Sequence, residues 1–238
     1  MLKCLVHLTK CNLRLLIFIS ILLIFSCQEK KTVTDSNINL PNKVTETPGA
    51  TVNSDDEFDE RKKWQKPDKV IDMLGDLENK VVADIGAGIG YFSVKLLPRA
   101  KKVIATDIDT SSISILKNIQ KLNERYRGKL DVRLATPDDT KILDNELDLI
   151  LIVNTITYIS NRKEYLRNLE AKLKPGGHLV IVDFKTKKFP EFIKDAPAYE
   201  DRIYLHVIEE ELESVGYTIV RSDDTSLDYQ FVVFATLQ

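Results

Sequence analysis

Three features of the sequence predict an α/β domain with a doubly wound, seven-stranded and mostly parallel sheet. Short aliphatic runs alternate with amphipathic helical segments along most of the chain. A glycine-rich segment at residues 86–90 directly follows the first of these runs. The last two runs, 218–221 and 231–235, have no room for a crossover helix between them, so we expect a C-terminal antiparallel hairpin. Ligands of such sheets bind at the carboxyl ends of the strands, near the switch in strand order.

The predicted strands are short runs bounded by charged residues, glycine or proline. They lie at residues 81–85, 102–106, 130–134, 147–153, 179–184, 218–221 and 231–235. The fourth run is almost entirely aliphatic, which is typical of a central strand that is covered on both faces. The sequence therefore places residues 147–153 near the middle of the sheet.

The predicted helices fill the intervals between these strands. Residues 91–97 form a helix that Pro98 ends, and Asp109 begins a run of capping residues for the next helix. Residues 174–177, Lys-Pro-Gly-Gly, are expected to end a third helix, and Gly216 a fourth. The apolar positions expected on the buried faces are Ile115, Leu116, Ile119 and Leu122, then Leu166, Leu169 and Leu173, and finally Leu205, Ile208, Leu212 and Val215.

Residues 1–26 predict a signal peptide of the bacterial lipoprotein type. Basic residues precede an uncharged, mostly apolar run at 15–25, which is too short to cross a bilayer. The run leads into Ile24-Phe25-Ser26-Cys27, which resembles a lipobox, although phenylalanine is unusual at its position. The resemblance implies cleavage before Cys27 and lipidation of its thiol. An uncleaved anchor or an incorrect start site is the alternative.

Residues 27–56 predict a disordered tether, because they are polar and cannot bury enough apolar surface to offset the entropy of ordering. Residues 57–238 are then the folded domain. This organisation predicts a membrane-anchored lipoprotein of the bacterial cell envelope, on the periplasmic side or at the outer membrane. The membrane partner would be reached through the lipid anchor.

Composition excludes several kinds of partner. A net charge of −2 gives no basic surface large enough to predict a nucleic-acid partner. The three cysteines all lie within residues 1–27, so the domain has neither a disulfide framework nor a thiolate metal site. Its histidines, His178 and His206, are too few and too far apart to indicate a zinc centre. We therefore predict no metal.

The segment after the first strand carries the clearest chemical signal. It reads Asp84-x-Gly86-x-Gly88-x-Gly90, and glycines at these positions let the backbone turn sharply and approach a ligand closely. The spacing differs from that of a dinucleotide-binding loop, whose third glycine would stand at Tyr91. A buried carboxylate at Asp84 would repel a pyrophosphate and favour a cationic ligand. An NAD-dependent oxidoreductase is therefore disfavoured.

This acid and glycine pattern resembles the class I S-adenosylmethionine-dependent methyltransferases, in their small-molecule branch that includes quinone and sterol methyltransferases. The resemblance covers most of residues 62–234 and includes the Lys174-Pro175-Gly176-Gly177 segment. It implies a Rossmann-like fold, S-adenosyl-L-methionine as cofactor, and transfer of a methyl group to a small or lipidic acceptor. The cofactor-binding residues that it implies are Asp84, Gly86, Ala87, Gly88, Gly90, Asp107, Ile108, Asp138 and Asn154.

Two of these acids have specific implied roles and structural alternatives. Asp107 ends the second strand, where an acid can accept hydrogen bonds from both ribose hydroxyls; the alternative is a helix cap. Asp138 follows the third strand, where the family contacts adenine; the alternative is a turn acid. Trp64, Lys66 and Pro67 match a helix that lies over the cofactor in related proteins, and simple packing is an equal alternative for Trp64.

The resemblance weakens after the fourth strand, and the catalytic residues stay unidentified. Asn154 replaces an acid of the related sequences, and Thr157 and Tyr158 replace two histidines. A general base at these positions is therefore lost or changed, which leaves Tyr158 and Asp183 as weak catalytic candidates. The main alternative to an enzyme is a catalytically inactive binding module of the cell envelope. The acceptor and the oligomeric state are not predicted.

Overall fold

The computed structural model describes the backbone of residues 54–237 and the side chains of residues 60–237. The predicted signal peptide, Cys27 and nearly all of the predicted tether lie outside these residues. Within residues 54–237, no helix has both the length and the apolar character needed to cross a bilayer.

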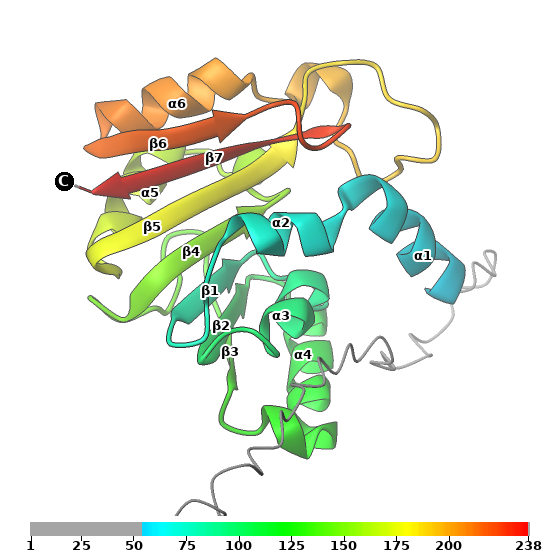
Figure 1. Ribbon diagram of the computed structural model, residues 1–238, viewed down its shortest axis with the longest axis vertical. Helices are drawn as coiled ribbons and strands as arrows, with labels where there is room; N and C mark the ends of the chain where they lie inside the picture. Colours follow the sequence, from blue (N-terminus) through cyan, green and yellow to red (C-terminus); the bar gives the residue numbers. More distant parts are fainter. Residues whose placement is uncertain (1–53, 238) are drawn as a thin grey trace, which may run out of the picture. The chain divides into compact units, whose positions relative to one another are not determined.

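The described domain is built on the seven-stranded mixed sheet that the sequence predicts (Figure 1). Its strands are β1 (Val81–Ile85), β2 (Lys102–Asp107), β3 (Leu130–Leu134), β4 (Leu147–Val153), β5 (Leu173–Phe184), β6 (Tyr217–Asp223) and β7 (Gln230–Leu237). They lie in the order β3-β2-β1-β4-β5-β7-β6. The first five are parallel, and β7 pairs antiparallel with both β5 and β6. The predicted fold class and the C-terminal hairpin are confirmed.

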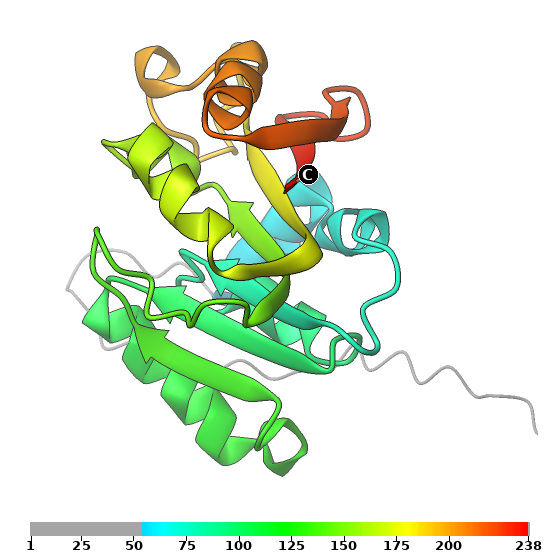
Figure 2. The same cartoon turned by 90° about the vertical axis from the view of Figure 1, so that its left-hand side faces the viewer.

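Six α-helices of the described residues surround this sheet. They are α1 (Ser54–Gln65), α2 (Pro67–Met73), α3 (Tyr91–Leu96), α4 (Thr110–Leu122), α5 (Arg162–Glu170) and α6 (Leu205–Ser214). Three short 3-10 helices, Glu124–Tyr126, Ile156–Tyr158 and Tyr199–Asp201, lie in the connections. In Figure 2 the cyan α2 and the lime α5 lie on opposite sides of the sheet, as the doubly wound topology requires.

One predicted boundary is wrong, and the reason is local. We expected the segment 174–177 to end a helix that includes Leu173, with a strand from residue 179. Instead α5 ends at Glu170, and β5 begins at Leu173 and runs through the glycines. Leu173 pairs with Leu147 of β4, and the register shifts between Leu147 and Leu149. This irregularity lets the strand accommodate Pro175, which has no N–H to donate.

The buried face of α4 also differs from the expected one. Ile113, Leu116 and Ile119 are buried, whereas Leu122, which we expected on this face, is 77% exposed. Leu122 is the last residue of the helix, where the chain turns away toward the 3-10 segment Glu124–Tyr126. The helical periodicity that predicted burial of Leu122 therefore does not hold at the last residue of the helix.

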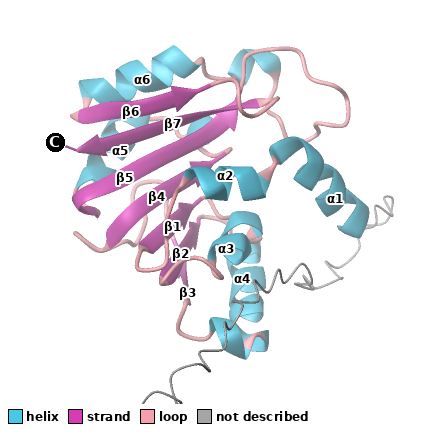
Figure 3. Cartoon of the chain, viewed as in Figure 1, coloured by secondary structure: helices cyan, strands magenta, loops and turns pink. Residues whose placement is uncertain are grey.

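The strand order positions the candidate site. The chain moves outward from β1 to β3 and then returns to place β4 on the other side of β1, so the switch in strand order lies between β1 and β4. Figure 3 shows the arrowheads of β4 and β5 pointing toward the side on which α1 lies. The carboxyl ends of the parallel strands therefore meet beside the amino-terminal helices, where ligands of this fold class bind.

Candidate functional site

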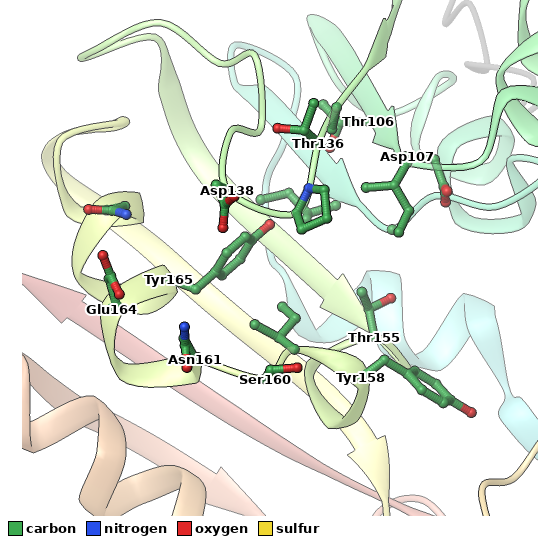
Figure 4. A pocket seen from close by; sticks show the side chains of 17 residues that line it. Thr106, Asp107, Thr136, Asp138, Thr155, Tyr158, Ser160, Asn161, Glu164 and Tyr165 are labelled. Carbon is green, nitrogen blue, oxygen red and sulfur yellow. The ribbon is translucent and has the colours of Figure 1, made fainter.

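A pocket of about 680 Å³ lies at the carboxyl ends of β1, β2 and β3 and the loop after β4 (Figure 4). Its walls combine apolar side chains with convergent carboxylates, hydroxyls and amides, as is typical of small-molecule sites. The lining residues are Ile85, Gly86, Thr106, Asp107, Ile108, Ala135, Thr136, Pro137, Asp138, Thr155, Tyr158, Ile159, Ser160, Asn161, Glu164, Tyr165 and Asn168.

The glycine loop closes one end of this pocket in a conformation that requires glycine. Gly86 has a φ of 72°, and a Cβ added there would lie 2.3 Å from Thr155 Oγ1. The loop is fixed to β2, because the N–H groups of Gly86 and Ala87 both donate to the carbonyl of Thr106. At Gly88, whose φ is 54°, an added Cβ would meet no atom of the described residues within 4 Å. The loop backbone is thus open beside Gly88 for close contact with a ligand.

Asp84 lies behind the loop and makes its surroundings anionic. Its side chain is only 2% exposed, and one carboxylate oxygen accepts a hydrogen bond from Ser93 Oγ at 2.6 Å. Burial raises the pKa of Asp84 to about 6; the Ser93 bond lowers it, the charge of Asp107 raises it and that of Arg61 lowers it. Two carboxyl groups beside one loop disfavour a pyrophosphate and favour a cation.

Asp107 and Asp109, at the end of β2, have different roles. Asp109 is the N-cap of α4, since its carboxylate accepts from the N–H groups of Ser111 and Ser112 at 3.2 and 2.8 Å. The helix-cap alternative for Asp107 is therefore wrong. Asp107 accepts from the N–H of Gly88 at 2.7 Å and from the N–H of Asp109 at 2.8 Å, and it lines the pocket. These two bonds orient its carboxylate and leave further acceptor positions on both oxygens.

The loop after β3 forms the opposite end of the pocket. Thr136 and Asp139 form an isolated antiparallel bridge, so the two residues between them form the tip of a tight turn. Asp139 takes the role of the turn acid, because its carboxylate accepts from the N–H of Lys141. Asp138 instead lines the pocket, and Figure 4 shows the hydroxyl of Tyr165 pointing toward this loop.

The structure brings together only part of the predicted site. Gly86, Asp107, Ile108 and Asp138 line the pocket, with Asp84, Ala87, Gly88 and Gly90 in the strand and loop that shape its end. Asn154 does not line the pocket. It has a φ of 55°, and its Oδ1 accepts a hydrogen bond from Gln230 Nε2 of β7. In this geometry Asn154 joins β4 to β7.

The two weak catalytic candidates lie in different environments. Tyr158 lines the pocket but is 66% exposed, and Figure 4 shows its hydroxyl pointing away from Asp138 and Tyr165. Burial and the charge of Asp183 raise the pKa of Tyr158 above its ordinary value, which makes it a poor base. Asp183, at the end of β5, is 1% exposed, and burial raises its pKa to about 6. Asp183 does not line this pocket.

The sequence did not identify the residues that α5 contributes. Glu164, Tyr165 and Asn168 of α5 line the pocket, together with Ile159 and Asn161 of the segment that precedes the helix. They follow β4 in the connection that begins at the strand-order switch, and that position was the available signal. No local sequence pattern predicts them, because it is the position of α5 in the fold that brings these side chains to the pocket.

Residues 83–181 match the family model described as a methyltransferase domain. The match covers 99 of the 238 residues and shows that this part of the chain is similar to that family. The match spans β1 through most of β5 and so contains every residue that lines the pocket.

The curated relatives of this chain are distant and longer than the matched region. The ubiquinone/menaquinone biosynthesis C-methyltransferase of Geotalea daltonii is 28% identical over 116 residues, which cover 48% of this chain and 49% of that protein. The demethylmenaquinone methyltransferase of Tropheryma whipplei (strain Twist) is 29% identical over 157 residues, which cover 66% of this chain and 59% of that protein. The chain thus spans between about half and three fifths of the length of these relatives.

Solved structures share the fold of this domain. A SAM-dependent methyltransferase from Aquifex aeolicus superimposes with a TM-score of 0.67 at 23% identity, covering 75% of this chain and 93% of that one. The family match and this fold imply S-adenosylmethionine as the cofactor.

The residues present fit that cofactor. The pocket lining includes the apolar residues Ile108, Pro137 and Ile159, which suit an adenine ring, and Asp107, which can accept from both ribose hydroxyls. Thr106 Oγ1, which lines the pocket, is buried and has no hydrogen-bond partner among the described residues. Asp84 contributes negative charge near a sulfonium. Among residues 54–237, no cluster of side chains could hold a metal ion.

Proposed function

We propose that this protein is an S-adenosylmethionine-dependent methyltransferase that acts on a small or lipidic acceptor. The observation that carries the proposal is the carboxylate of Asp107, held by two backbone N–H groups at the edge of a pocket of about 680 Å³. The names of two relatives, both concerned with quinones, support an apolar acceptor that resembles a quinone.

In the proposed reaction the protein aligns the reactants and excludes water. The bound cofactor supplies an activated methyl group on its sulfonium. Asp107 orients the ribose, and the glycine loop lets the backbone approach the amino-acid end of the cofactor. Asp183 is the better proton acceptor of the two candidates, because a carboxyl with a pKa of about 6 is mostly ionised at neutral pH.

Titration of the cofactor product S-adenosylhomocysteine into the wild type, Asp107→Ala and Asp109→Ala tests this assignment. Hydrogen bonds to a charged group contribute about 1.5–3 kcal/mol each, so Asp107→Ala should lose on the order of 10²-fold or more in affinity. Asp109→Ala should lower the melting temperature, because a lost cap costs about 1 kcal/mol, and leave affinity nearly unchanged. Wild-type affinity in Asp107→Ala would refute the ribose assignment.

A second candidate function is a cofactor-binding module that no longer transfers methyl groups. Its support is the segment after β4, where Asn154, Thr157 and Tyr158 stand in place of the acid and histidines of related sequences. Assays with radiolabelled cofactor and quinol or lipid acceptors separate the two candidates. Product formation supports the enzyme, whereas binding without transfer to any acceptor tested supports the module.

We also propose that Cys27 carries a lipid that anchors the protein in the bacterial cell envelope. The support is the sequence alone: a basic start, the apolar run at 15–25, and a cysteine at the position of a lipobox cysteine. An anchored enzyme would reach acceptors that reside in a membrane, which agrees with a lipidic substrate.

A further inference from the structure

The first residue of β7, Gln230, reaches the carboxyl end of β4 with its side chain. Gln230 pairs with Phe184 of β5, and β5 lies between β7 and β4 in the sheet. Because β7 runs antiparallel to β5, its first residues lie beside the arrowheads of β4 and β5 (Figure 1). Gln230 is fully buried, and its Nε2 donates a hydrogen bond of 2.5 Å to Asn154 Oδ1. This bond ties the start of β7 to the first residue after β4, across an intervening strand.

Asn154 has a backbone conformation that needs such support. Its φ of 55° lies in the left-handed region, which is unfavourable for residues other than glycine, although asparagine tolerates it better than most. Its N–H donates to the carbonyl of Val182 in β5 at 2.9 Å, so its backbone and its side chain are held by two different strands. Strained conformations of this kind persist where the surrounding structure fixes them.

The turn at Asn154 determines where one wall of the pocket begins. The next residue, Thr155, lines the pocket and occupies the space beside Gly86, since a Cβ added to Gly86 would lie 2.3 Å from Thr155 Oγ1. Residues 158–161, which follow, also line the pocket. A change in the direction of the chain at Asn154 would therefore move this wall relative to the glycine loop.

The amide of Gln230 makes no second hydrogen bond to the described residues. Its Oε1 is buried and has no partner among them. Burying an amide that is only partly hydrogen-bonded costs free energy, so a hydrophobic side chain at this position would stabilise the sheet better. What the glutamine provides in return is the bond to Asn154. This favours a role in shaping the pocket wall over a role in stabilising the sheet.

We propose that Gln230 is a positioning residue of the pocket: by holding Asn154 in its left-handed conformation, it sets residues 155–161 against the glycine loop. The identity of the ligand used in the test rests on the proposed function, whereas the fixed wall does not. Gln230 does not line the pocket, so it acts through Asn154 and Thr155. The inference extends the site to a strand outside the segment that matches the family model.

Two measurements on the full-length protein test this inference. Calorimetry gives the affinity for S-adenosylhomocysteine, and hydrogen exchange followed by mass spectrometry gives the protection of residues 155–161 without ligand. The variants are Gln230→Met, which has no amide, and Gln230→Glu, which keeps an acceptor for a rotated Asn154 amide. Thr236→Val is the matched control, since it removes a side-chain hydrogen bond to the carbonyl of Gly177 near the other end of β7.

We expect Gln230→Met to bind S-adenosylhomocysteine roughly 10-fold more weakly, as for the loss of one hydrogen bond, and to exchange faster at residues 155–161. Gln230→Glu should keep most of the affinity, and Thr236→Val should match the wild type in both measurements. Glycine adopts the left-handed conformation without strain, so in an Asn154→Gly background the further loss caused by Gln230→Met should be about twofold at most.

Unchanged exchange and affinity in Gln230→Met overturn the inference, as does an equal loss of affinity in the Asn154→Gly background. If Gln230→Met does not fold, Asn154→Ala breaks the same bond from the other side, and the same two measurements decide. If the wild type does not bind S-adenosylhomocysteine, the proposed function fails, and the exchange of residues 155–161 alone decides this inference.

Discussion

At the scale of single residues, the carboxyl ends of the parallel strands gather acids whose surroundings give them different properties. Asp84 and Asp183 are buried, and burial raises the pKa of each to about 6. Asp109 is exposed, and its bonds to Ser112 lower its pKa. The pKa values of aspartates within one domain are thus shifted in opposite directions by their surroundings.

The buried carboxyl of Asp183 makes stability depend on pH. Its pKa is about 6 when folded and about 3.9 when unfolded, so it contributes stability below pH 4 that is lost as pH rises through 6. The variant Asp183→Asn has no carboxyl to ionise at this position, so its stability should not fall in this way as pH rises. The difference in unfolding free energy, variant minus wild type, should increase by about 2–3 kcal/mol from pH 4 to pH 7. Urea unfolding at several pH values measures it.

Asp109→Asn is the control for this experiment. Because its folded pKa is lowered, Asp109 contributes stability above the unfolded pKa that is lost as pH falls. The difference between this variant and the wild type should therefore change in the opposite direction. A pH-independent difference for Asp183→Asn would show that its carboxyl is not desolvated as the structure indicates.

At the scale of elements, α1 is held to the domain by its single tryptophan. Trp64 is 4% exposed, its ring lies 5.6 Å from that of Phe184, and Ile193 completes the cluster. Packing, one of the two alternatives from the sequence, accounts for these contacts. Trp64 thus fixes α1 against the carboxyl end of β5.

Trp64→Ala should lower the unfolding free energy by about 3–5 kcal/mol, as truncation of a buried aromatic residue leaves a cavity. Denaturant unfolding followed by circular dichroism measures the change. Leu122→Ala is the control: Leu122 is 77% exposed at the end of α4, so its loss should cost little. A loss below about 1 kcal/mol for Trp64→Ala would contradict the packing role.

The sequence predicted elements well where local chemistry decides them. The Asp109 cap, the glycine loop and the hairpin of β6 and β7 follow from residue type and spacing, and all are confirmed. The start of β5 was wrong because pairing with β4 overrode a Pro-Gly-Gly signal that usually ends a helix. Tertiary pairing of this kind is invisible in a single segment.

In the candidate site too, the sequence predicted the residues that local position determines and missed those that depend on tertiary structure. Asp107 and Asp138 were identified because a strand end or the loop after it places them by position alone. Tyr165 was not, because it reaches the pocket from α5, whose placement depends on the whole fold. Asn154 was assigned to the cofactor, but its amide is bonded to Gln230, 76 residues away in sequence.

At the scale of the whole molecule, the proposed anchor makes a prediction that is independent of the cofactor. Cys27→Ala should release the protein from membranes or block processing, because no other cysteine remains after cleavage at that position. Membrane fractionation and intact-mass spectrometry of the expressed protein measure both outcomes. Cys11→Ala, within the predicted signal, is the control and should fractionate like the wild type. An unchanged mass and membrane fraction for Cys27→Ala would refute the lipoprotein assignment.

The antiparallel direction of β7 decides where a reporter can be attached. Gln230 of β7 pairs with Phe184 at the carboxyl end of β5, and Thr236 pairs with His178 toward its amino end. β7 therefore ends, at Leu237, at the end of the sheet opposite the carboxyl ends of the parallel strands. A fluorophore or an immobilising tag fused after Gln238 would stand clear of incoming ligands. One inserted just before Ser54 would join α1, whose other end packs Trp64 against Phe184, so surface-binding measurements should immobilise the C-terminus.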